Sequence, residues 1–108
     1  MNKEFVYRQI VLLEKNLSHD PKSMRDLHIL MNQLEGLCSA LKKEGLSFDW
    51  IEKIENKCGI FEEIYAVNLD EGISTLSKED FELINPTILC LKILVKSVKS
   101  SFELFSHT

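Results

Sequence analysis

The chain is built from stretches in which apolar residues recur every three or four positions, with polar residues between them. Near the start, Val6, Ile10, Leu13 and Leu17 are spaced four, three and four residues apart. This spacing places their side chains on one face of an α-helix. The pattern therefore predicts a first helix over residues 3–17.

The second stretch has the most regular pattern. Its apolar residues follow a three–four alternation: Met24, Leu27, Met31, Leu34, Cys38 and Leu41. Pro21 suits the first turn of a helix capped by Asp20, and Gly45 suits the left-handed residue that commonly ends one. We expect a helix over residues 21–44 that packs against a neighbour at a shallow angle.

A third helix is expected from just after Ser47, a candidate cap, to about Asn68. Its apolar residues share one face on both sides of Gly59: Ile51, Ile54, Cys58, Phe61 and Tyr65. Glycine costs up to ~1 kcal/mol relative to alanine inside a helix, so a break at Gly59 is the alternative. Because the apolar stripe continues in phase, we interpret the stretch as one helix.

Turn-forming residues divide the last third of the chain. Residues 69–76 read as the longest loop, and Ser77 offers a cap for a short helix over residues 78–84. Pro86 biases the residue before it away from the helical conformation. We therefore expect a separate final helix over residues 86–105.

The first half of this final helix is apolar almost all round, because Ile88, Leu89 and Ile93 lie outside its main apolar sector. Such a helix is usually covered on several sides by its neighbours. A strand over the same apolar run would have no partner strand. The sequence predicts an all-α single domain, residues 1–108, formed by a bundle of four to five helices with the helix over 86–105 at its centre.

Composition agrees with a soluble globular protein: of the 108 residues, 44% are hydrophobic and 28% are charged. The three cysteines Cys38, Cys58 and Cys90 form no CxxC pair, so we expect core residues in a reducing compartment. No apolar run approaches the ~20 residues that a membrane span needs. Together with the absence of an apolar leader, this predicts a cytoplasmic protein that does not contact a membrane.

Catalytic and cofactor motifs are not found in the sequence. His19, His28 and His107 are scattered, and no metal-binding spacing or phosphate-binding glycine loop occurs. Acidic pairs three residues apart lack the Glu-x-x-His motifs that accompany helical di-metal sites. We expect no catalytic residue, no metal and no cofactor, and hence not an enzyme.

Nucleic-acid binding is also disfavoured, because the formal net charge is −4. The only basic stripe consists of Lys92, Lys96 and Lys99 on the final helix. We expect these lysines to keep one side of that helix in water or to pair with acids of a neighbouring helix.

Acidic residues are concentrated in one region. Residues 44–82 contain eleven acids and three lysines, a net charge of −8, whereas the remainder carries +4. Such a surface steers a basic partner toward it, although solubility alone is the plainer interpretation. The predicted partner-binding residues are Glu52, Glu55, Glu62, Glu63, Tyr65, Asp70, Glu71, Glu79 and Asp80.

Two function classes follow from this surface. The first is an inhibitor that covers the basic cleft of a partner such as a nuclease toxin. Its candidate aromatic anchors are Tyr65, Phe61 and Trp50, although core packing is the expected role of Phe61 and Trp50. In size, charge and class, the chain is similar to the small acidic helical immunity proteins of bacterial competition systems. The alternative is an adaptor or secretion-type chaperone that forms a homodimer or binds an amphipathic helix of a client.

Overall fold

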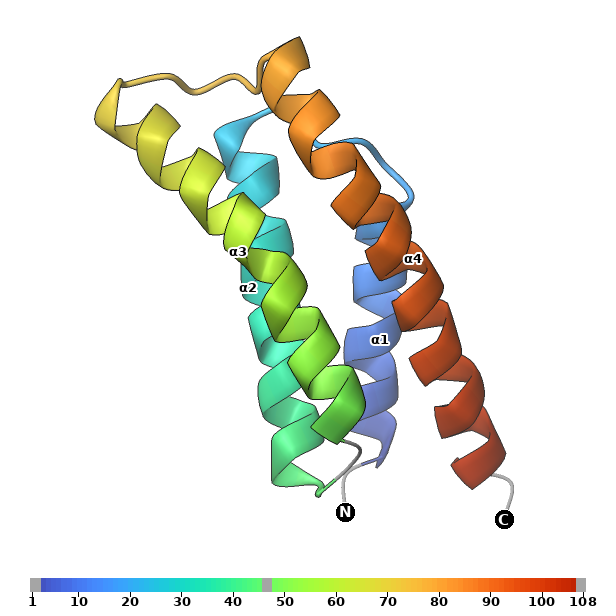
Figure 1. Cartoon of the computed structure of the whole chain (residues 1–108). Helices are drawn as coiled ribbons and strands as arrows, with labels where there is room; N and C mark the ends of the chain where they lie inside the picture. Colours follow the sequence, from blue (N-terminus) through green and yellow to red (C-terminus); the bar gives the residue numbers. More distant parts are fainter. Residues whose placement is uncertain (1–2, 46–47, 107–108) are drawn as a thin grey trace.

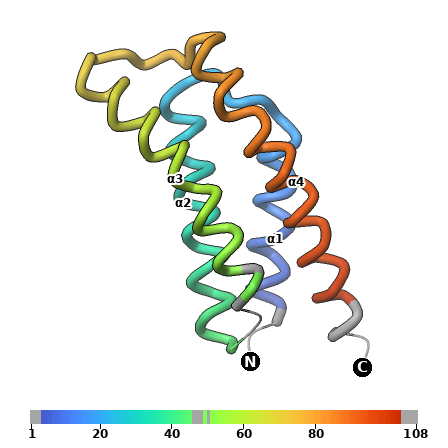
Figure 2. Tube along the Cα trace, in the orientation of Figure 1, coloured from blue at the N-terminus to red at the C-terminus, as the bar shows by residue number. Residues whose placement is uncertain are grey.

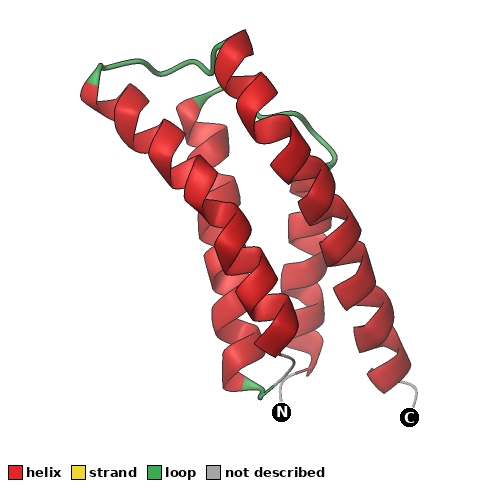
Figure 3. Ribbon diagram, viewed as in Figure 1, coloured by secondary structure: helices red, strands yellow, loops and turns green. Residues whose placement is uncertain are grey.

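The computed structural model describes residues 3–45 and 48–106. In these residues it contains four α-helices and no strand: α1 (Lys3–Leu17), α2 (Met24–Lys43), α3 (Phe48–Asp70) and α4 (Lys78–Ser106) (Figure 3). The predicted all-α helical bundle is confirmed.

Consecutive helices run antiparallel, so the chain goes up and down the bundle axis (Figure 1). α1 and α3 each pack against α2 and α4, whereas the diagonal pairs are not adjacent within the described residues. The result is a rod with extents of 49 × 21 × 20 Å. The loop between α3 and α4 lies at the same end of the rod as the loop between α1 and α2.

Every helix contributes a stripe of buried residues, spaced mainly three and four apart, to one apolar core. The largest fully buried side chains are Phe61, Ile10, Leu13, Leu17, Leu27, Leu34, Leu37, Leu41, Ile54, Ile84, Ile88 and Leu91. Each side chain of this kind stabilises the fold by about 1.5–3 kcal/mol relative to leaving it in water. Helix propensity alone would not hold helices of these lengths together in water.

The first helix has the predicted bounds, but the predicted start of the second at Pro21 is wrong. α2 begins at Met24, because Ser23 is its N-cap and accepts a hydrogen bond from the amide of Asp26 at 3.1 Å. The carboxylate of Asp26 in turn accepts from the amide of Lys22. These two hydrogen bonds satisfy backbone amides at the start of α2, so the helix begins after Pro21, which lies in the loop.

The predictions for the third helix are confirmed where the structure describes them. α3 is continuous through Gly59, whose exposed position leaves open space where a side chain would stand. It ends at Asp70, two residues beyond the predicted end, and Gly72 then turns the chain with a φ of 71°. The proposed cap Ser47 lies outside the described residues.

The prediction of two helices separated at Pro86 is wrong. α4 is one helix from Lys78 to Ser106, and its trace is a continuous coil in Figure 2. A proline inside a helix costs roughly 3 kcal/mol, chiefly through one lost hydrogen bond and a clash with the preceding turn. Burial of Ile84 and Ile88, on either side of Pro86 and on the same face, offsets this cost.

The predicted central position of the last helix is also not observed. Among the described residues, α4 lies beside α1 and α3 only, and each of the other helices likewise lies beside two neighbours. Leu89 and Ile93, which suggested cover on several sides, are 50% and 70% exposed. The extra apolar residues of α4 therefore face solvent, which requires an explanation other than core packing.

Two backbone hydrogen bonds join the loops at one end of the bundle. The amide of Met24 donates to the carbonyl of Ser74 at 2.9 Å, and the amide of Leu76 donates to that of Lys22 at 3.0 Å. They form an isolated antiparallel bridge between Ser23 and Thr75. The loop after α3 is thereby held over the end of the core.

Candidate protein-binding surface

The predicted acidic residues are exposed, except for the partly buried Asp80, but they do not form one face. α3 separates them, because it is flanked by α2 on one side and by α4 on the other. Some line a groove between α2 and α3, and others line a groove between α3 and α4. Glu52 and Asp70 line neither.

The α2–α3 groove has a volume of about 470 Å³ and includes the predicted residues Glu55, Glu62 and Tyr65. Glu55 forms an ion pair with Lys42 across the groove. The ring of Tyr65 stacks on His28, with ring centroids 5.3 Å apart. These contacts use two of the three predicted residues within the protein itself.

Two cysteines stand in this groove as protonated thiols. Burial raises the pKa of Cys38 to about 12 and that of Cys58 to about 11. A thiol that stays protonated is a poor nucleophile and a poor metal ligand, as expected for a packing residue. The same expectation for Cys90 is wrong: it is exposed on α4, because Ile88 and Leu91 occupy the neighbouring core positions.

The second groove lies between α3 and α4 beside the α3–α4 loop, and we call it the loop-end groove. Its volume is about 510 Å³, and it contains the predicted acids Glu63, Glu71, Glu79 and Asp80. Exposed apolar side chains lie among these acids: Val67 (56% exposed), Leu83 (60%) and Ile73.

The buried residue Asn68 fixes the base of the loop-end groove. Its amide Nδ2 donates to the carbonyl of Ile64, 2.9 Å away, and to Oδ2 of Asp80, 3.0 Å away. The amide of Asp80 also donates to Oγ of Ser77, the predicted helix cap. The last turns of α3 are thus tied to the first turn of α4.

A third groove continues between α3 and α4 toward the opposite end of the rod, and we call it the far-end groove. It measures about 360 Å³, and the residues that line it are Lys53, Lys57, Cys90, Ile93, Leu94 and Ser97. The sequence-based prediction missed it. The signal was present in Ile93, which lies outside the main apolar sector of its helix.

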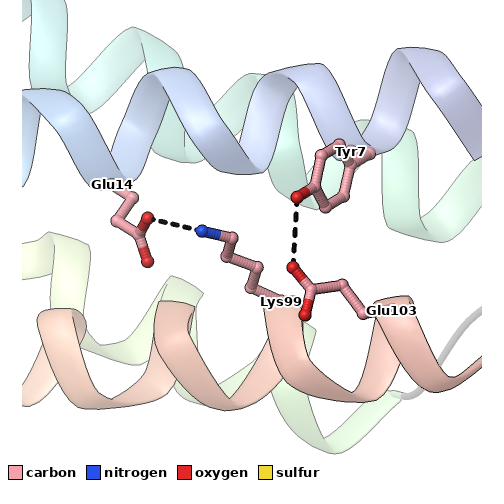
Figure 4. A network of polar contacts seen from close by, with 4 residues as sticks. All are labelled: Tyr7, Glu14, Lys99 and Glu103. Carbon is pink, nitrogen blue, oxygen red and sulfur yellow. Dashed lines mark hydrogen bonds and ion pairs between the residues drawn. The ribbon is translucent and has the colours of Figure 1, made fainter.

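In the described part of the chain, no lysine of α4 forms an ion pair with an acid of residues 44–82. Nζ of Lys99 lies 2.9 Å from Oε1 of Glu14, and the hydroxyl of Tyr7 donates to Glu103 at 3.1 Å (Figure 4). Both contacts join α4 to α1, on the side away from α3. The bond to Glu14 raises the pKa of Lys99, and the bond to Glu103 raises the pKa of Tyr7.

Within the described chain, only one predicted acid, Glu55, has an ion-pair partner. The acids of the loop-end groove have none there. Of the aromatic candidates, Phe61 is fully buried, as expected, and the side chain of Trp50 lies outside the described structure.

Comparisons with known proteins add no relative. No family model matches the chain, and no curated protein or solved structure is significantly similar to it. Among residues 3–45 and 48–106, no group of three or more potential metal-ligating side chains comes together. No helix in that part of the chain combines the length and apolar character needed to cross a bilayer.

Proposed function

We propose that this chain is a protein-binding module whose loop-end groove holds a basic segment of another protein. One observation carries the proposal: four acids without an ion-pair partner in the described structure surround exposed apolar side chains. Either feature alone is common on a protein surface. Their coincidence in one groove matches a ligand with both apolar and basic groups.

The chemistry of the groove supports an amphipathic ligand. Val67 and Leu83 offer apolar surface, whose burial contributes about 25 cal/mol per Å². Glu63, Glu71 and Glu79 border that surface and can accept charge-assisted hydrogen bonds from lysine or arginine. A segment with basic residues on both sides of an apolar stripe satisfies both parts.

The charge distribution also supports fast association with a basic partner. The net charge of −8 in residues 44–82 attracts positive surfaces over roughly a Debye length, ~8–10 Å at physiological salt. An inhibitor that covers the cationic, phosphate-binding cleft of another protein needs this property. The inhibitor class of immunity type is therefore the function that we favour.

The adaptor class is a second candidate, and the exposed apolar side chains of the loop-end groove, Val67 and Leu83, favour it. An adaptor would depend mainly on apolar contacts, whereas an inhibitor of a basic cleft would depend mainly on charge. Affinity measured as a function of salt separates the two classes. A fall of about tenfold or more between low and high ionic strength is expected for the inhibitor.

The location of the site can be tested with a fluorescent amphipathic peptide of leucine and lysine, about four turns long. The variant Glu63→Lys/Glu79→Lys should weaken binding about tenfold or more, measured by fluorescence anisotropy. The matched control is Glu52→Lys/Asp70→Lys, which makes the same change of charge outside all three described grooves.

Two results would contradict the proposal. If both double variants weaken binding equally, the peptide senses only the net charge and not the groove. If a peptide with serine in place of leucine binds as tightly, the exposed apolar side chains of the loop-end groove do not contribute to binding. Circular dichroism of each variant checks that the helices are retained.

A further inference from the structure

An apolar band, exposed except for the partly buried Ile60, runs along the α3–α4 face through both of its grooves. We define the α3–α4 band as Ile60, Val67, Leu83, Cys90 and Ile93. The first three line the loop-end groove, and the last two line the far-end groove. Ile93 is 70% exposed, more than any other large hydrophobic residue in the described structure. The band therefore continues past the loop-end groove into the far-end groove.

The two ends of the band carry opposite charge. The loop end holds four acids, Glu63, Glu71, Glu79 and Asp80, and the far end holds Lys53 and Lys57. Neither lysine has an ion-pair partner among the described residues. Apolar side chains therefore share the face with acids toward the loop end and with lysines toward the far end.

We propose that a second copy of this chain covers the α3–α4 band in an antiparallel, two-fold symmetric dimer. An isologous interface requires a surface that is complementary to itself, and a two-fold axis across the middle of the band brings each end against the opposite end of the partner copy. The acid-rich end of each copy then lies against the lysine-bearing end of the other, with Glu63 opposite Lys57. A parallel arrangement would place acids against acids, so the charges also select the direction.

The spacing along the helices fits this axis. Lys57 lies three residues before Ile60 on α3, and Glu63 lies three residues after it. A two-fold axis at the level of Ile60 therefore brings Lys57 of one copy opposite Glu63 of the other. On α4, Leu83 and Ile93 lie five residues before and after Ile88, so the same symmetry brings these apolar side chains together.

The face is large enough for a stable dimer. One side of the rod measures 49 by 20–21 Å, and α3 and α4 run along most of that length. A standard interface buries about 800 Å² per partner, less than the area of such a side. Burial of the band also removes the most exposed apolar residues of α4 from water.

This inference rests on the proposed function in one respect, since both use the loop-end groove. In the dimer, Lys53 and Lys57 of the second copy supply the basic groups that a partner protein would otherwise supply. A basic partner must then displace the second copy. The apparent affinity for the amphipathic peptide should therefore fall as the protein concentration rises.

Sedimentation velocity over a range of concentrations tests the dimer. Lys53→Glu/Lys57→Glu and Glu63→Lys/Glu79→Lys should each raise the dimer dissociation constant about tenfold or more, because like charges then meet at both ends. An equimolar mixture of the two variants should recover dimers, since one then has acidic ends and the other more basic ends. Lys92→Glu/Lys96→Glu is the control: it makes the same change of charge outside the band and should not affect dimerisation.

Cross-linking gives an independent readout. Cys90 lies within the band, whereas Cys38 is buried. A short bis-maleimide should link two wild-type copies through Cys90, and Cys90→Ser should prevent the link. A protein that stays monomeric to millimolar concentration, or a dimer unaffected by the charge variants, would overturn the inference. Peptide binding by such a monomer would leave the proposed function standing.

Discussion

The two sides of α3 differ in how far the protein satisfies its own surface. On the α2 side, the groove contains an ion pair between Glu55 and Lys42 and a stacked ring pair between Tyr65 and His28. On the α4 side, the acids have no ion-pair partner among the described residues, and the apolar side chains of Val67 and Leu83 are more than half exposed. The α2 side pairs these side chains within the protein, whereas the exposed acids and apolar side chains of the α4 side stay in contact with solvent.

The contrast shows that acidic residues close together in sequence need not share a role. Glu62 and Glu63 are adjacent in sequence, yet one lines the α2–α3 groove and the other lines the loop-end groove. Successive residues on a helix differ by about 100° in direction, which is enough to send them to different neighbours. Substitutions on the two sides of α3 should therefore have different effects.

The largest expected effect is a loss of stability of the whole bundle, which affects both sides of α3. Phe61 is fully buried in α3 and belongs to the core beneath both sides. Phe61→Ala should cost about 3–5 kcal/mol of unfolding free energy, through lost burial and the cavity left behind. Urea denaturation followed by circular dichroism measures this loss. Val67→Ala, on the exposed α4 side, is the control, and a comparable loss there would contradict the assignment of Val67 to a binding surface.

A smaller effect is expected from Asn68, which ties the end of α3 to the start of α4. Asn68→Ala should cost about 1–3 kcal/mol, because it removes hydrogen bonds made by a buried amide. Asn32→Ala is a matched control on the α2 side, where an exposed amide contacts His28 and little change is expected. If both variants lose the same free energy of unfolding, the hydrogen bonds of the buried Asn68 amide stabilise the fold no more than an exposed amide does.

The last effect concerns the pH dependence of stability and belongs to the α2 side. Burial raises the pKa of Cys38 from 9.0 to about 12 and that of Cys58 to about 11, so the folded protein keeps protons that the unfolded chain releases above pH 9. Stability contributed by these thiols is therefore present below pH 9 and is lost as pH rises toward 11 and beyond. The melting temperature should fall over this range.

Comparison with Cys38→Ala/Cys58→Ala isolates the thiols. The raised pKa values of Tyr7 and Lys99 act in the same direction, but these groups remain in the double variant. The decline in melting temperature between pH 9 and 11 should therefore be shallower in the variant, and equal slopes would exclude a contribution from the thiols.

The periodicity of apolar residues predicted the helices correctly where it was given more weight than the local preferences of glycine or proline. It gave the bounds of α1 and the continuity of α3 across Gly59. The same reasoning failed at Pro86 only because the local preference of proline was given more weight. Ile84, Ile88 and Leu91 are spaced four and three apart across that proline, and this phase indicates one helix.

The candidate site was predictable only in part. Charge counting along the sequence found the acids of the loop-end groove, because charged side chains are rarely buried. It could not divide them between two grooves, since that division depends on which helix flanks each side of α3. The apolar band was missed for a related reason: because Ile93 lies outside the main apolar sector of its helix, it was expected to be covered by neighbouring helices, whereas it is 70% exposed.

The order of the helices has a consequence for how the bundle folds. Three of its four helix contacts join consecutive helices, so they require only short loops to close. The contact between α1 and α4 is different, because Tyr7 and Glu103 are 96 residues apart in sequence and Lys99 and Glu14 are 85 apart. The entropic cost of closing a loop grows with its length, so we expect the contact between α1 and α4 to form last. We infer that these two polar contacts set the register in which the ring of helices closes.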